Sequence, residues 1–305
     1  MNIFNLIGPL FLLITLGYIL KKLNFFDENF KNQLNKLVYY IALPILLFNK
    51  TSNLNIEELN EFSIIFGFPI IIISISLIAF LFTLYIKKSK RGTFIQCAFR
   101  SNITYLGLPI IIAVLGDNAI GYAAMIIMVG TISNVLLSVF ILDFFNPKSN
   151  SKFFNKIKTA IINPLIISIG LGFIFSYLKI KLPLFLTNTL TLVSNISLPL
   201  ILIIIGFSFS FLRIKKYMSF NIFNGIIKLG IMPLFAFFLM KLFNPSEIII
   251  QTVVLMAAMP SAIVSQTFAQ EFNSDEKLTS SLINFNTLMA AFTIPLIIYL
   301  LGIMG

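Results

Sequence analysis

The chain alternates long apolar runs with short polar connections, and this pattern predicts ten membrane-spanning helices. Charged or turn-forming residues bound each run, and a helix needs about 20 apolar residues to cross a bilayer. The predicted spans are residues 3–20, 34–49, 62–86, 93–115, 118–142, 157–178, 188–212, 219–240, 248–270 and 279–303. The second run is short, and the amphipathic residues 26–36 before it are expected to extend its helix. We therefore expect an all-α membrane protein.

Composition agrees with this class. Of the 305 residues 58% are hydrophobic and 11% are charged, and the mean hydropathy is +0.98, which excludes a soluble globular domain. A net charge of +11 would suit a nucleic-acid-binding protein. The lysines, however, lie in short loops between apolar runs, so we interpret them as topology signals that face anionic lipid.

The basic residues are distributed unevenly between the two sets of loops. Sixteen of the 22 Lys and Arg residues lie in odd-numbered loops and four in even-numbered loops. By the positive-inside rule the odd loops are cytoplasmic, which predicts a protein of the cell (inner) membrane with both termini outside the cytoplasm. The remaining two, Arg100 and Lys228, lie within predicted spans.

The two halves of the chain echo each other. The Leu-Pro pair at 43–44 recurs at 198–199, an offset of 155, and Pro109 recurs as Pro260, an offset of 151. Each half holds five spans, and an odd number inverts the second copy. The predicted domains are a first repeat at 1–145, a cytoplasmic linker at 146–158 and an inverted repeat at 159–305. Inverted repeats with interrupted helices indicate a secondary transporter, the alternative being chance pairing of prolines.

The fourth span contains the most informative stretch. Polar residues at 101, 102 and 104 precede Gly107 and Pro109. Proline lacks an N–H and its ring crowds the carbonyl four residues back, so the helix is expected to break near Tyr105. In hydrocarbon, freed backbone groups are tolerated only where protein or a water-filled cavity satisfies them, which suggests a binding site at membrane depth. The alternative on this stretch alone is a simple proline kink, which is common in membrane helices.

Two broken helices would present half-helix N-termini, which suit an anionic group. The candidate amides follow Gly107 and surround Pro260 and Ser261, and the side chain of Asn102 could add a donor for a carboxylate. The alternative for Asn102 is an interhelical hydrogen bond.

Three further polar positions, and Arg100, are candidates for the same site. Ser265 and Gln266 follow the second break and could line the cavity or bond to their own helix. Lys228 falls near mid-bilayer, where it could neutralise carbonyl ends or face an anion. Arg100 could bind a carboxylate or extend to the interface.

Several chemistries lack the residues they need. The chain has no His and one cysteine, Cys97, so neither an intramolecular disulfide nor a Cys/His metal site can form, and we expect no metal and no cofactor. Intramembrane proteolysis needs His or paired Asp within spans, so we expect no enzyme. No Asp or Glu falls inside a predicted span, so a carboxylate proton relay is not visible and coupling to protons or sodium stays open.

Several motifs in order along the chain resemble the auxin efflux carrier family, whose plant members export auxin. They cover nearly the whole chain and are residues 16–18 (LGY), 39–44 (YYIALP), Asn102 with 107–109 (GLP), 163–164 (NP), 198–199 (LP) with Gly206, and 257–260 (AAMP) through 268–272 (FAQEF).

The resemblance implies ten helices in two inverted repeats of five, with broken helices 4 and 9 crossing at their prolines. Helices 1, 2, 6 and 7 would form a scaffold, and helices 3–5 and 8–10 would move as an elevator. It assigns substrate contact to the Asn seven residues before Pro109, which is Asn102, and it matches Asn163 to the helix-six Asn-Pro element. Bacterial relatives are described as carriers of small organic acids such as malate or malonate.

We therefore expect a secondary active transporter of small organic anions, malate-like, malonate-like or auxin-like, that works in the lipid bilayer by alternating access, with a homodimer as one oligomeric state. The alternatives are a sodium-coupled symporter of the bile-acid type and a membrane sensor that does not transport.

Overall fold

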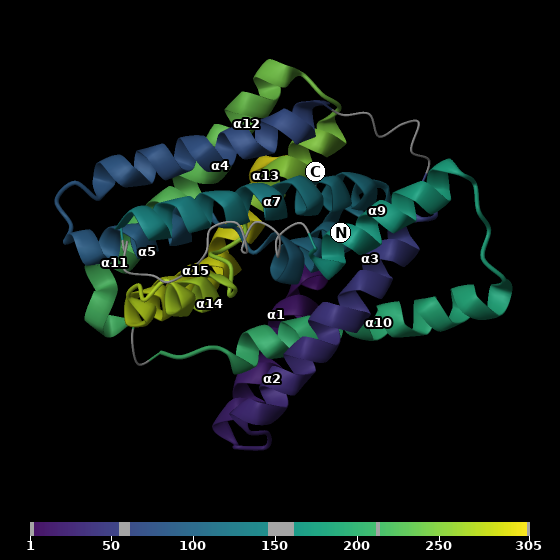
Figure 1. The fold of residues 1–305 in the computed structure, drawn as a ribbon, viewed down its shortest axis with the longest axis horizontal. Coiled ribbons are helices and arrows are strands. Elements are labelled where there is room, and N and C mark those ends of the chain that lie inside the picture. Colours follow the sequence, from purple (N-terminus) through teal and green to yellow (C-terminus); the bar gives the residue numbers. More distant parts are fainter. Residues whose placement is uncertain (1–2, 55–61, 146–161, 212–213, 304–305) are drawn as a thin grey trace. The chain divides into compact units, whose positions relative to one another are not determined.

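The computed structural model describes residues 3–54, 62–145, 162–211 and 214–303. Across these residues the regular elements are helices, and the only β-type pairing is an isolated bridge (Figure 1). Six helices are long and apolar enough to cross a membrane, and three shorter apolar helices accompany them. The prediction of an all-α, multi-span protein is thus confirmed for this part of the chain. The predicted linker 146–158 lies outside the described residues.

The chain divides into two compact units, each assembled from separated segments. Unit 1 comprises Met1–Glu61, Thr104–Met128 and Ile162–Phe209, and unit 2 comprises Phe62–Ile103, Val129–Ile161 and Ser210–Gly305. Each unit draws on both predicted repeats, so the compact units are not the repeats themselves.

In unit 1 the apolar helices α1 and α10 pack against each other at glycine residues. In α1 a Cβ on Gly17 would lie 2.1 Å from the Ile203 carbonyl oxygen of α10, and on Gly206 1.8 Å from that of Ile14. Only glycine permits such close backbone approach. Unit 1 contains α1 (Ile3–Lys22), α2 (Glu28–Leu37), α3 (Leu43–Thr51), α6 (Leu108–Leu115), the start of α7 (Ile120–Phe145), α9 (Pro164–Tyr177) and α10 (Leu184–Phe207).

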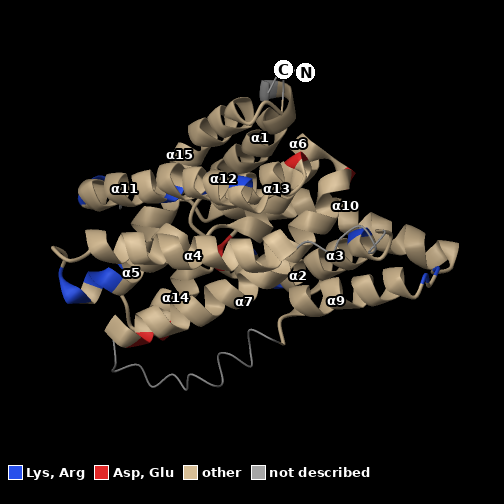
Figure 2. Cartoon of the chain, turned by 90° about the horizontal axis from the view of Figure 1, so that it is seen from above, with Lys and Arg blue, Asp and Glu red and all other residues tan. Residues whose placement is uncertain are grey.

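Unit 2 surrounds the polar core described below. Helices α4 and α12 lie side by side in it (Figure 1), and a basic group marks the start of α5 (Figure 2). Unit 2 contains α4 (Phe62–Phe82), α5 (Lys88–Phe99), the remainder of α7, α11 (Met218–Gly225), α12 (Met232–Phe243), α13 (Glu247–Ala258), α14 (Ser265–Glu271) and α15 (Glu276–Leu300).

Three π-helical turns precede prolines: Val38–Ala42, Ile103–Gly107 and Ile226–Ile231. The α-helix after each one carries its proline, Pro44, Pro109 or Pro233, at the second position. A wider turn accommodates the missing N–H and the bulk of the ring without ending the helix. The predicted lead-in to the second span accordingly continues as helix from Glu28 to Thr51.

Candidate functional site

Two helices of unit 2 end inside it, and the residues that follow them pair with each other. After α5 and α13 the backbone becomes extended, and Asn102 N donates to Pro260 O at 2.8 Å while Ala262 N donates to Arg100 O at 2.9 Å. These bonds flank an antiparallel bridge between Ser101 and Ser261. We call residues 100–102 and 260–262 the crossing.

The serines of the crossing exchange roles between the two helices. In an uninterrupted helix the carbonyls of Cys97 and Ala257 would accept from the amides four residues on, at Ser101 and Ser261. Instead, Ser261 Oγ donates to Cys97 O at 2.5 Å, and Ser101 Oγ lies 3.2 Å from Ala257 O as a donor. Each serine hydroxyl thus satisfies a C-terminal carbonyl of the other helix.

The predicted position of the first break is wrong. Tyr105 and Gly107 lie in the π turn, Gly107 has helical angles (φ −62°, ψ −51°), and Pro109 lies inside the helix that continues to Leu115. The π turn accommodates Pro109, so the chain breaks three residues before Tyr105, at the crossing, which contains Pro260 but not Pro109. The amides after Gly107 are therefore not a helix N-terminus, and the amide of Ala262, beside Ser261, already bonds to Arg100.

Lys228 is fully buried beside one serine of the crossing. From the π turn of residues 226–231, its Nζ contacts Ser101 Oγ at 2.5 Å, Ala257 O at 2.9 Å and Met232 Sδ at 2.9 Å. An ammonium has three N–H donors, and each of these three atoms can accept one of them.

A neutral residue fills the corresponding place beside the other serine. Asn286 Nδ2 lies 2.8 Å from Ser261 Oγ and 2.9 Å from Asn224 Oδ1, and Asn224 Nδ2 donates to Phe94 O at 2.9 Å. The two sides of the crossing are thus satisfied by one cation and one amide.

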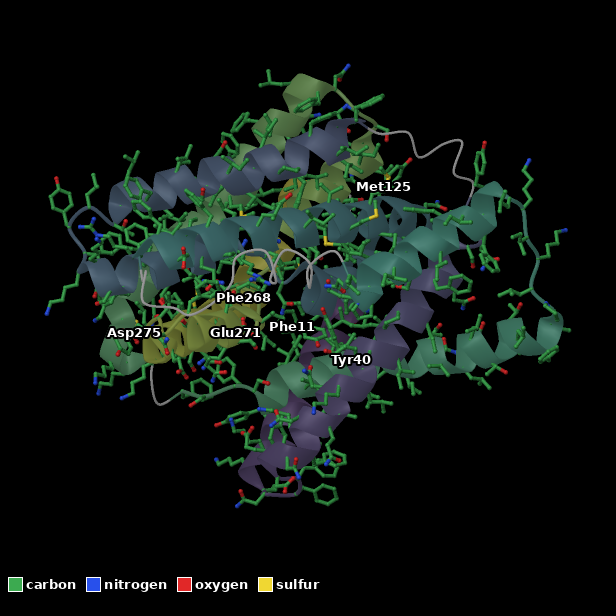
Figure 3. The ribbon with its side chains drawn as sticks, viewed as in Figure 1. Phe11, Tyr40, Met125, Phe268, Glu271 and Asp275 are labelled. Atoms are coloured by element: carbon green, nitrogen blue, oxygen red, sulfur yellow. The ribbon has the colours of Figure 1, made fainter. Side chains whose placement is uncertain are left out.

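Arg100 points into unit 2 and not toward its surface, since the residue is only 6% exposed. Its Nη1 donates to Ser138 Oγ of α7 at 3.1 Å, and its guanidinium carbon lies 4.2 Å from the centroid of the Phe268 ring. Phe268 belongs to α14 and is labelled in Figure 3. The ring restrains the guanidinium plane by a cation–π contact. Extension to the interface is therefore not the conformation that Arg100 adopts.

Asn134 of α7 lies at the same level as the crossing. This follows from the way α7 runs antiparallel to α5. Gly92 of α5 lies against Leu142 of α7, whereas Gly130 of α7 lies against Ile103 beyond the end of α5. Asn134 is one turn from Gly130 and one turn from Ser138, the partner of Arg100. It is buried, and its Oδ1 has no hydrogen-bond partner among the described residues.

Two predicted residues of α14 add similar atoms. Ser265 is fully buried and its Oγ has no partner in the described part of the chain, and the same holds for Gln266 Oε1. Phe272, the residue directly after this helix, packs on Val139 and Leu142 of α7, so α14 runs from the crossing toward that contact. The alternative that Ser265 bonds to its own helix is not what the structure contains.

Asn102 itself contributes its backbone to the crossing. The residue is 5% exposed, and the bond that joins it to the other strand of the crossing is made by its backbone N–H, not by its side chain. An unpaired buried polar group costs about 1–3 kcal/mol. The buried oxygens of Asn134 and Ser265, which have no partner among the described residues, are therefore typical of a binding site.

Asn163 occupies a different setting, in unit 1. Its Oδ1 accepts from Leu165 N at 2.9 Å, which caps α9, and its Nδ2 donates to the Tyr39 hydroxyl at 2.9 Å. Both ends of the side chain are engaged, so its described role is a helix cap.

Sequence reasoning missed Asn134, Ser138 and Asn286. A signal was present, because Asn134 and Ser138 lie four residues apart in a largely apolar span and therefore share a helix face. Among the described residues no group of three metal-ligating side chains occurs. The site therefore offers a cation and neutral hydrogen-bonding groups, which suit an anion.

Comparison with known proteins agrees with this architecture. Residues 2–298 match the family described as "Membrane transport protein". An uncharacterized transporter of Methanocaldococcus jannaschii is 26% identical over 303 residues, covering 93% of this chain and 94% of the archaeal one. Both matches extend over nearly the whole chain and identify a multi-pass transport protein, not an enzyme. The chain belongs to the membrane transport protein family, as its likeness to the auxin efflux carriers predicts.

Proposed function

We propose that this protein is a secondary active transporter of small organic anions and that it binds their carboxylate at the crossing. The observation that carries the proposal is the pair of buried oxygens without partners, Asn134 Oδ1 and Ser265 Oγ, in the part of unit 2 where Arg100 bonds to Ser138. Asn102, two residues from Arg100, is also buried. Gln266 contributes a further unpartnered oxygen from α14.

An anion fits these groups for electrostatic reasons. A guanidinium binds carboxylates through a planar fork of N–H groups, and such charge-assisted bonds are about twice as strong as neutral ones. Burial lowers the local dielectric constant and strengthens the attraction further. The Asn102 amide would donate a second bond, and the oxygens of Asn134 and Gln266 would accept from a hydroxyl or a protonated acid group of the substrate.

Alternating access by an elevator movement is the mechanism that we propose. The spans expected to form the scaffold (3–20, 34–49, 157–178 and 188–212) fall largely within unit 1, and four of the expected moving spans (62–86, 219–240, 248–270 and 279–303) fall within unit 2. Residues 93–115 and 118–142 are divided between the units. The ten-span inverted repeat, the cytoplasmic-membrane location and the outside termini form part of this proposal.

The test is uptake by purified protein in proteoliposomes. Labelled malate, malonate and an indole acid are offered in turn, with protein-free liposomes as the control and with sodium or choline as the outside cation. Saturable uptake of a carboxylate that excess unlabelled carboxylate abolishes supports the proposal, and uptake of none of these acids in either direction contradicts it. Uptake that requires sodium would identify the sodium-coupled alternative.

A further inference from the structure

Lys228 differs from its counterpart in the crossing, because the hydroxyl of the other serine is hydrogen-bonded by a neutral residue. Asn286 donates to Ser261 Oγ without a charge, so hydrogen bonding alone does not require an ammonium beside Ser101. Burying an uncompensated ammonium costs several kcal/mol. The charge on Lys228 therefore calls for a role of its own.

The partners of Lys228 are cation ligands. A hydroxyl oxygen and a helix C-terminal carbonyl are groups that transporters use at interrupted helices to coordinate a coupling cation. Here Ser101 Oγ and Ala257 O contact Nζ at 2.5 and 2.9 Å. The carbonyl belongs to the last turn of α13, where the helix dipole favours positive charge.

No acidic group balances this cation within the described structure. The ion pairs found there join Lys31 to Glu28, Lys50 to Asp117 and Lys241 to Glu247, and none includes Lys228. Its compensation comes from oxygen and sulfur dipoles, as for a bound metal ion. The next residue after its partner Ser101 is Asn102, so the charge stands one residue from the proposed anion site.

We infer that Lys228 is a resident cation, a tethered ammonium that occupies the cation-binding place of the crossing. It acts as a positioning residue that holds Ser101 and the end of α13 together and places a fixed positive charge behind the anion. The inference rests on the proposed function for its role in transport, but the occupancy of the cation place is independent of transport.

Chemical rescue tests the inference on the full-length protein. Lys228→Ala removes the ammonium and leaves space for a small cation, Lys228→Met keeps the bulk without the charge, and Lys241→Ala removes a half-exposed lysine of the same unit as a matched control. The unfolding temperature of each protein is measured in choline, sodium and ethylammonium chloride at one ionic strength.

We expect the unfolding temperature of wild type to be the same in all three salts, and likewise that of Lys241→Ala. Lys228→Ala should lose at least about 3 °C in choline and regain half or more of that loss in ethylammonium or sodium. Lys228→Met should stay destabilised in every salt because its side chain fills the place.

Three results would overturn the inference. One is a sodium-specific stabilisation of wild type, the second is a folded Lys228→Ala that responds equally to all three salts, and the third is Lys228→Met with wild-type stability and uptake. If Lys228→Ala does not fold in any salt, the inference is tested by the first and third results, which use wild type and Lys228→Met. Failure of wild type to transport any carboxylate contradicts the proposed function and leaves the unfolding measurements, and hence the occupancy of this place, to be judged separately.

Discussion

Ser101 and Ser261 face each other across the crossing, and each hydroxyl bonds the carbonyl that the other serine's amide would have satisfied in an unbroken helix. The exchange explains how two helices can end at a buried place. Without Ser261 the Cys97 carbonyl would lose this donor where water is excluded, whereas Ala257 O also accepts from Lys228 Nζ.

Ser261→Ala should therefore destabilise the protein without removing a charged group. It leaves Cys97 O without its serine donor and removes one of the two acceptors of Asn286 Nδ2. We expect a cost of about 1–3 kcal/mol, which thermal unfolding would register as a fall of several degrees. Ser133→Ala is the control, because that hydroxyl bonds to Val129 O within its own helix. Equal unfolding temperatures for the two variants would contradict the cap.

Asn102→Ala should abolish transport and preserve the fold. Its backbone N–H keeps the bond to Pro260 O, while the side-chain amide is lost. We expect carboxylate uptake in proteoliposomes to fall at least about tenfold, which corresponds to about 1.4 kcal/mol of binding. Asn53→Ala, which changes an exposed amide at the end of α3, should transport normally. Normal uptake by Asn102→Ala would remove Asn102 from the site.

Arg100→Lys tests whether the fork of the guanidinium matters or only its charge. A lysine retains one positive charge but loses planar bidentate binding and the stacking on Phe268. We expect the concentration for half-maximal uptake to rise about tenfold for Arg100→Lys and more for Arg100→Gln, because a guanidinium–carboxylate bond contributes about 1.5–3 kcal/mol. If both variants bound substrate as wild type does, Arg100 would contact only other residues of the protein and not the substrate.

Gly17→Ala should destabilise unit 1, because the new Cβ would lie 2.1 Å from the Ile203 carbonyl oxygen, a backbone atom that cannot rotate away. We expect a loss of about 1–3 kcal/mol. Gly8→Ala in the same helix is the control, since nothing lies within 4 Å of its Cβ position. Alanine favours a helix interior over glycine by about 1 kcal/mol, so that variant should unfold at the wild-type temperature or higher.

The sequence predicted the class of the protein and named residues of the candidate site, for physical reasons that are local. Apolar runs long enough for a bilayer predict helices whatever they pack against, and Arg100, Lys228 and Asn102 stood out because charged and amide groups are costly in hydrocarbon. The family match supports the same reading. Asn134 and Ser138 carried the same signal more weakly, since a single amide or hydroxyl in a span is common.

What the sequence alone determined was therefore which segments are helical and which of their residues are too polar to face lipid. Only the tertiary structure decided where the helices break and what each polar group bonds. Pro109 predicts a break by its own chemistry, but a π turn accommodates it, while the chain opens at Ser101 because Ser261, 160 positions away, supplies the missing hydrogen bond. A carbonyl in a low-dielectric interior must find a donor, and in this fold that donor comes from the other broken helix, which no local pattern reveals.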